Sequence, residues 1–78
     1  MTKTLQPKLP HARYIVLHHD GAWKINLNNS YYGPFTTQEA AVESATATAR
    51  QASEGGYPAS VLLMKGTEFE TLWTSEAA

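Results

Sequence analysis

An Asp-Gly pair between two β-prone runs is the feature that most constrains how this chain folds. Asp20-Gly21 separates residues 14–19 from residues 22–27, and both runs are rich in β-branched, aromatic and aliphatic side chains. A two-residue type I′ turn needs positive φ at both central positions, which Asp tolerates and Gly adopts freely. The sequence therefore predicts a β-hairpin over residues 14–27.

The hairpin turn fixes which side chains share a face, because paired residues of antiparallel strands point the same way. We expect the core face to carry Tyr14, Val16, His18, Trp23, Ile25 and Leu27. The outer face then carries Ile15, Leu17, His19, Ala22, Lys24 and Asn26.

Turn and cap signals divide the next part of the chain into a strand and a helix. The Asn-Asn-Ser run at 28–30 predicts a turn before a short strand at 31–35. Thr36 and Glu39 match a capping box that opens a helix, with Phe35 at the staple position. The helix should run to about Ser53 and end at the following Gly pair. Its apolar stripe consists of Ala41, Val42, Ala45, Ala49 and Ala52.

A second hairpin is predicted from strands at 59–65 and 68–74, joined by a turn at Gly66 and Thr67. One face carries Leu62, Met64, Phe69, Thr71 and Trp73, and the other carries Val61, Leu63, Glu68, Glu70 and Leu72. Because two carboxylates belong to the second set, we expect that set to form the outer face.

The predicted fold class is α+β, a two-layer arrangement β-β-β-α-β-β in which one helix packs on one face of an antiparallel sheet. Residues 1–12 are expected to be a flexible lead-in, residues 13–74 a single domain, and residues 75–78 a frayed tail.

Composition limits the class of protein. The 78 residues include no Cys, so no disulfide or thiolate metal site stabilises this small domain, and a partner subunit or a well-packed core must do so. The absence of Cys fits a reducing compartment. No apolar stretch is long enough to span a membrane, and the N-terminus does not resemble a secretory signal. We therefore expect a cytoplasmic protein.

The outer face of the sheet is unusually apolar for a face that water is expected to cover. We predict that it binds a protein partner, most simply a second copy of the chain. The residues predicted to bind the partner are Ile15, Leu17, His19, Lys24, Val61, Leu63 and Leu72. Alternatively, Leu5 and Leu9 of the N-terminal segment fold back over this face.

Other chemistry receives little support. His18 and His19 are adjacent on a strand and point to opposite faces, so they cannot chelate one metal ion together. No Ser lies in a nucleophile-elbow motif, and no carboxylate pair has a predicted cleft, so we expect no enzyme and no cofactor. Gly55-Gly56-Tyr57 follows a helix, whereas phosphate loops precede one.

Six Lys and Arg residues and a net charge of −1 argue against nucleic-acid binding, which relies on phosphate neutralisation. Most aromatic residues belong to the predicted core, but Tyr31 and Tyr32 are adjacent, so one of them must face outward. The alternative function is a weak nucleic-acid-binding domain that uses Arg13, Lys24, Tyr31, Tyr32 and Lys65.

The pattern as a whole resembles a group of small bacterial domains of unknown function. The residues that carry the resemblance are the Gly21-Ala22-Trp23 hairpin, the Thr36-Thr37-Gln38-Glu39-Ala40 helix start, the Ala-rich helix and the closing hairpin after Val61. The resemblance covers residues 13–74. It departs from the group at Lys65-Gly66-Thr67, where an Asp-Gly turn is expected. It implies the fold and brings no substrate, cofactor or catalytic residue.

Overall fold

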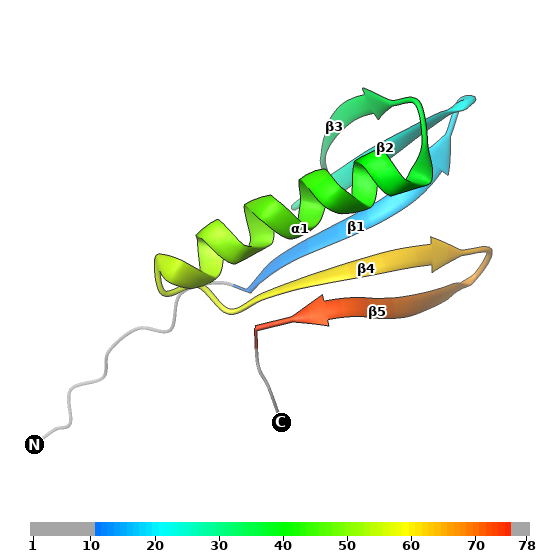
Figure 1. Cartoon of the computed structure of the whole chain (residues 1–78). Coiled ribbons are helices and arrows are strands. Elements are labelled where there is room, and N and C mark those ends of the chain that lie inside the picture. The colour runs from blue at the N-terminus through cyan, green and yellow to red at the C-terminus, as the bar shows by residue number, and fades with distance from the viewer. Residues whose placement is uncertain (1–10, 76–78) are drawn as a thin grey trace, which may run out of the picture.

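A computed structural model describes residues 11–75 and shows a five-stranded sheet with one helix across one face (Figure 1). In chain order the elements are β1 (Ala12–His19), β2 (Ala22–Leu27), β3 (Ser30–Phe35), α1 (Gln38–Glu54), β4 (Ala59–Lys65) and β5 (Glu68–Thr74). The sheet order is β3-β2-β1-β4-β5. The α+β class and the order of elements are confirmed. One neighbouring pair, β1 and β4, is parallel, so the sheet is mixed and not wholly antiparallel.

The first hairpin forms as predicted. Asp20 and Gly21 have φ values of 54° and 77°, as a type I′ turn requires. The strand register from Tyr14 opposite Leu27 to His19 opposite Ala22 matches the prediction at every pair. Asn28 and Asn29 have φ values of 53° and 70° and form a second turn of the same kind between β2 and β3.

An irregular segment interrupts the pairing of β3 with β2 before the chain reaches the helix. A register shift separates the pairs made by Trp23 and Ile25, and the Gly33-Pro34 peptide is cis. Gly33 has φ of 128°, and a Cβ atom there would lie 3.1 Å from the Trp23 carbonyl oxygen. Only glycine meets both conditions without displacing its neighbours.

The helix begins one residue later than the sequence predicted. Thr37, not Thr36, is the N-cap, and its Oγ1 accepts a hydrogen bond of 3.0 Å from the Ala40 N–H. The predicted capping box of Thr36 with Glu39 is therefore wrong, because the position three residues after Thr37 is an alanine. At the other end, the Gly55 N–H donates to the carbonyls of Gln51 and Ala52, which ends the helix after Glu54.

The cap assignment predicts different effects for two adjacent threonines. Thr37→Ala removes the acceptor for the Ala40 N–H and should lower the free energy of unfolding by about 1 kcal/mol. Thr36→Ala removes no such contact and should change it by less than about 0.5 kcal/mol. Urea denaturation followed by circular dichroism measures both values. A larger loss for Thr36→Ala than for Thr37→Ala would contradict the cap.

The core lies between the alanine stripe of α1 and the central strands. Ala41, Ala45 and Ala49 are completely buried, as predicted, and a helix with such small side chains approaches the sheet closely. They pack with Tyr14, Val16, Ile25, Ala59, Val61 and Leu63. The first hairpin therefore turns its predicted core face toward α1.

The second hairpin has the predicted strand pairing from its turn to Leu62 and Thr71, but the opposite orientation. Met64 pairs with Phe69 and Leu62 with Thr71, as expected. Beyond Thr71 the register shifts, and Trp73 pairs with Val61 and shares its face, not the predicted face of Leu62. However, Val61 is 0% and Leu63 is 5% exposed in the core under α1, so their placement on the outer face was wrong. The parallel pairing of Tyr14 with Val61 sets this orientation, because laterally paired residues share a face.

Two carboxylates misled the prediction because β5 lies beyond the edge of the helix (Figure 1). α1 packs over β1 and β4 and reaches β2 and β3. Glu68 and Glu70 are paired with Lys65 and Leu63 and so share the helix side of the sheet, where both remain exposed to water. On a strand that no helix covers, a carboxylate does not identify the outer face.

Candidate interaction surface

The face of the sheet that points away from α1, here called the open face, carries an apolar cluster. Alternation and pairing place Ile15 beside Leu62, and Met64 beside Phe69, with Leu17 on the same side of β1. The apolar cluster is therefore Ile15, Leu17, Leu62, Met64 and Phe69. Phe69 is 55% exposed, Ile15, Leu62 and Met64 are half-buried, and Leu17 is buried. Among residues 11–75 no helix or further strand covers this face.

The structure divides the residues predicted to bind a partner. Ile15, Leu17, His19 and Lys24 lie on the open face, Val61 and Leu63 lie in the core, and Leu72 lies beside α1 on the opposite side of the sheet. The expectation that Leu5 and Leu9 cover the outer face concerns positions outside the described residues. The open face keeps its apolar character because Leu62, Met64 and Phe69 replace the residues assigned to it.

Sequence reasoning missed Leu62, Met64 and Phe69 because either orientation of the second hairpin presents apolar side chains to α1. Val61 and Leu63 alternate with Leu62 and Met64, and the two polar residues of β4, Ser60 and Lys65, lie on opposite faces, so polarity in β4 does not distinguish them. The available signal was Ala59, at the start of β4. It lies two residues before Val61 and therefore on the same face, and it is completely buried in the core cluster that contains the alanines of α1.

Polar and aromatic side chains border the apolar cluster. Arg13, opposite Ser60, and Lys24, opposite Leu17, both lie on the open face. The His19 ring stacks on Tyr31, with ring centroids 5.8 Å apart. Lys24, His19 and Tyr31 make the border near β2 and β3 basic and aromatic, and Arg13 lies at the start of β1. The cluster itself extends toward β5.

The start of β1 is fixed to the open face by a side-chain contact. His11 Nε2 lies 3.0 Å from Ser60 Oγ, and Ser60 is buried. The Ala12 N–H also donates to the Pro58 carbonyl at 2.8 Å. Both contacts hold the beginning of the described chain against β4.

The two adjacent histidines have separate structural roles. His18 packs on Trp23 on the helix side with ring centroids 4.9 Å apart, as the sequence predicted. His19 Nδ1 lies 3.5 Å from an Asp20 carboxylate oxygen, and both side chains are largely exposed. In the described part of the chain, no three His, Cys, Asp or Glu side chains are grouped so that they could hold a metal ion.

Tyr14 is the titratable group whose environment is most distinctive. Burial raises the pKa of its phenol, and the nearby Tyr32 raises it further. A higher pKa favours the neutral phenol, which fits the position of Tyr14 in the core.

Comparison with known proteins gives a family and no function. A family model described as "Uncharacterized protein conserved in bacteria (DUF2188)" matches residues 13–66. No curated protein and no solved structure matches the chain. The one helix within residues 11–75 lacks the length and apolar character needed to cross a membrane.

Proposed function

The chain belongs to the bacterial DUF2188 family of uncharacterised proteins, and we propose that it is a non-enzymatic interaction module that binds a second copy of itself through the open face. The observation that supports this proposal is the apolar cluster opposite α1. An antiparallel or mixed sheet with only one covered face usually presents polar side chains to water on the other. Contiguous exposed apolar side chains are typical of protein interaction sites.

The size of the domain also supports a partner. A chain of this length buries only about 60% of the surface that its unfolded form exposes, so its stability is marginal. No disulfide links any part of it, because the sequence contains no Cys. A second copy on the open face would bury Phe69 and the half-buried Leu62 and Met64, and so add apolar contacts to a small core.

The charges on the open face permit a twofold dimer. Arg13 and Lys24 lie on β1 and β2, whereas the apolar cluster is centred on β1, β4 and β5. A twofold axis through the cluster on its β5 side places the Lys24 side chains of the two copies at opposite ends of the interface, and Arg13 lies beyond the apolar residues at the start of β1. The hydrophobic centre is then buried, and the like charges stay apart at the polar border.

Paired substitutions in β5 test this proposal. Phe69 lies on the open face and Leu72 lies beside α1, although both belong to the same strand. Phe69→Ser should weaken dimerisation by about thirtyfold or more, since two rings lose their contacts in each dimer. Leu72→Ser should leave the dissociation constant unchanged. Light scattering on a sizing column over a wide concentration range measures both.

Two results would contradict the open-face dimer. One is a monomer at every concentration of the full chain. The other is a dimer that Leu72→Ser weakens as much as Phe69→Ser does.

A second candidate is the weak binding of single-stranded nucleic acid, favoured by the grouping of Arg13, Lys24 and Tyr31 on one face. Stacked aromatic rings beside cations are typical of such surfaces. Two of the residues named for this function lie elsewhere: Tyr32 pairs with Ile25 on the helix side, and Lys65 forms a 2.8 Å ion pair with Glu70. A salt titration with a mixed oligonucleotide pool separates the candidates, because binding that does not weaken with salt is inconsistent with phosphate contacts.

A further inference from the structure

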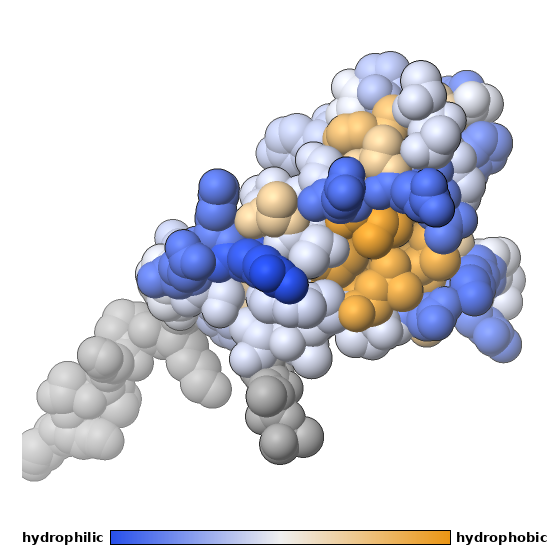
Figure 2. Space-filling model, in the orientation of Figure 1, coloured by the Kyte–Doolittle hydropathy of each residue, from blue (hydrophilic) through white to orange (hydrophobic). Residues whose placement is uncertain are grey.

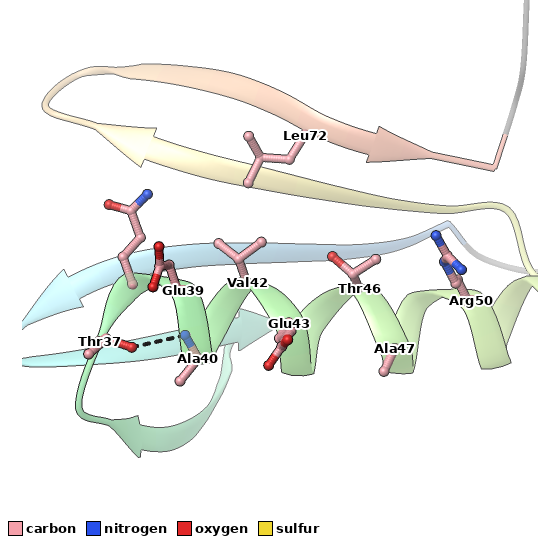
Figure 3. Close-up of a pocket in the computed structure, with 10 residues that line it drawn as sticks. Thr37, Glu39, Ala40, Val42, Glu43, Thr46, Ala47, Arg50 and Leu72 are labelled. Carbon is pink, nitrogen blue, oxygen red and sulfur yellow. Dashed lines mark hydrogen bonds between the residues drawn. The ribbon is translucent and has the colours of Figure 1, made fainter.

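A groove on the helix side of the sheet lies between residues 37–50, at the start and middle of α1, and Leu72 of β5. It has a volume of about 980 Å³. Figure 2 shows apolar surface gathered between the helix and the lower strands. In Figure 3, Val42, Thr46 and Arg50 project from α1 toward the sheet, and Leu72 points from β5 toward the helix. The apolar floor of the groove therefore includes Val42 and Leu72.

The groove exists because α1 is centred over β1 and β4 and leaves β5 uncovered. A bulge at the end of the second hairpin widens the apolar floor. Val61 pairs with Trp73 and Leu62 with Thr71, so Leu72 is the additional residue in β5. Leu72 and Trp73 consequently both lie on the helix side, where Trp73 packs against the core.

β5 is also an edge strand that can accept another strand. In the part of the chain that the structure describes, no strand lies beyond it, and alternate residues of an edge strand direct their N–H and C=O groups outward. The other edge, β3, contains Gly33 and Pro34, and Pro34 has no N–H to donate. β5 contains neither glycine nor proline. The edge beside the groove is thus the more receptive of the two.

The charges around the groove are unequal at its two ends. Glu39 and Glu43 of α1 line it, and Glu68 and Glu70 lie at the start of β5, which is at the same end as the start of α1 (Figures 1 and 3). Lys65 pairs with Glu70 at 2.8 Å. Glu39, Glu43 and Glu68 form no salt bridge with another described residue, so this end has a net negative charge.

We propose that β5 and the groove bind an extended segment of another protein that is basic at one end and apolar at the other. The segment adds to the sheet as a sixth strand, with main-chain hydrogen bonds to β5. Its helix-side residues alternate with residues on the open side, so one or two apolar side chains lie over Val42 and Leu72. Its Lys or Arg side chains lie near Glu39, Glu43 and Glu68.

A designed peptide tests the proposed chemistry directly. The probe is the labelled peptide Lys-Ser-Lys-Thr-Val-Thr-Val-Thr, which presents lysine and valine on one side, together with the same peptide in reverse order to allow either strand direction. Fluorescence anisotropy against the full chain should show binding by one of the two that weakens with salt. A version with glutamate in place of lysine should not bind.

Backbone modification separates strand addition from simple attraction between charges. N-methylation of alternate residues removes the N–H groups that face β5 and leaves the charge unchanged. It should reduce binding by about tenfold or more, since several main-chain hydrogen bonds are lost together. Two modified peptides are needed, one N-methylated at the odd-numbered residues and one at the even-numbered residues. If both bind as tightly as the unmodified peptide, strand addition is overturned.

Matched variants of the protein locate the site. The double variant Glu39→Gln, Glu43→Gln should weaken binding by about three- to tenfold, whereas Glu54→Gln at the exposed end of α1 should have no effect. Leu72→Ser should weaken peptide binding and Phe69→Ser should not, the reverse of their expected effects on the open-face dimer. A variant that loses dimerisation can therefore still be tested for peptide binding, and a variant that loses peptide binding can still be tested for dimerisation.

Three results would overturn the proposal. The first is the failure of both lysine peptides to bind the folded protein. The second is the same affinity for the Glu39→Gln, Glu43→Gln variant and the Glu54→Gln variant. The third is a dimer of the protein alone that Leu72→Ser dissociates, which would assign the groove to a second copy of the chain.

Discussion

Val61→Asp should abolish cooperative folding, whereas Leu62→Asp, one position along the same strand, should leave a folded protein. Val61 is completely buried beneath α1, and an aspartate there would lose the valine contacts and place an unpaired carboxylate in the core. The combined cost is about 4–5 kcal/mol, which is comparable to the whole stability of a small domain.

Leu62 is the control because it differs from Val61 in the face it occupies and not in its strand. In the monomer its side chain is half-buried on the open face, where a carboxylate remains in contact with water, so the substitution affects the proposed dimer and not the core. Leu62→Asp should cost about 1 kcal/mol. Urea denaturation followed by tryptophan fluorescence distinguishes the two variants. If Leu62→Asp unfolded the protein and Val61→Asp did not, the orientation of the second hairpin would be the reverse of the one described.

Ala45→Leu should destabilise the protein by about 1–3 kcal/mol through overpacking. Ala45 is completely buried at the centre of the helix stripe and belongs to the core cluster that also contains Val16 and Val61. The additional three carbon atoms have no space unless α1 moves away from the sheet. A displaced helix would also separate Ala41 and Ala49 from the strands beneath them.

Ala47→Leu is the matched control, since residue 47 lies on the same helix and is exposed. It should change the free energy of unfolding by less than about 0.5 kcal/mol, because leucine and alanine have similar helix propensities and no core contact changes. Thermal denaturation measures both variants. Equal melting temperatures for Ala45→Leu and the unmodified chain would show that the helix does not approach the sheet as closely as described.

Local signals in the sequence were sufficient to predict the elements and the pairing within each hairpin as far as the bulge at Leu72. Asp20-Gly21 determined the register of the first hairpin, and the alanine spacing identified the buried stripe of α1. The helix start was wrong by one residue because both Thr36 and Thr37 are good N-cap residues. Only the backbone geometry decides which of the two accepts the bond from the helix.

The face of the sheet was predicted correctly for the named residues of the first hairpin and incorrectly for those of the second. Ile15, Leu17, His19 and Lys24 lie on the open face because the Asp-Gly turn and the alternation of β1 and β2 are local properties. Val61, Leu63 and Leu72 were misplaced because their position depends on contacts with strands and a helix that are distant in the sequence.

By itself, the sequence determined where each strand and the helix form, which residues pair across each turn, and which helix face is buried. These properties arise from short-range backbone preferences and side-chain periodicity. The tertiary structure alone decided that β4 lies parallel to β1, that Val61 faces α1, and that β5 extends beyond the helix. Both faces of the second hairpin contain apolar side chains, so its orientation is set by close packing with β1 and the alanine stripe, which no local pattern in the hairpin encodes.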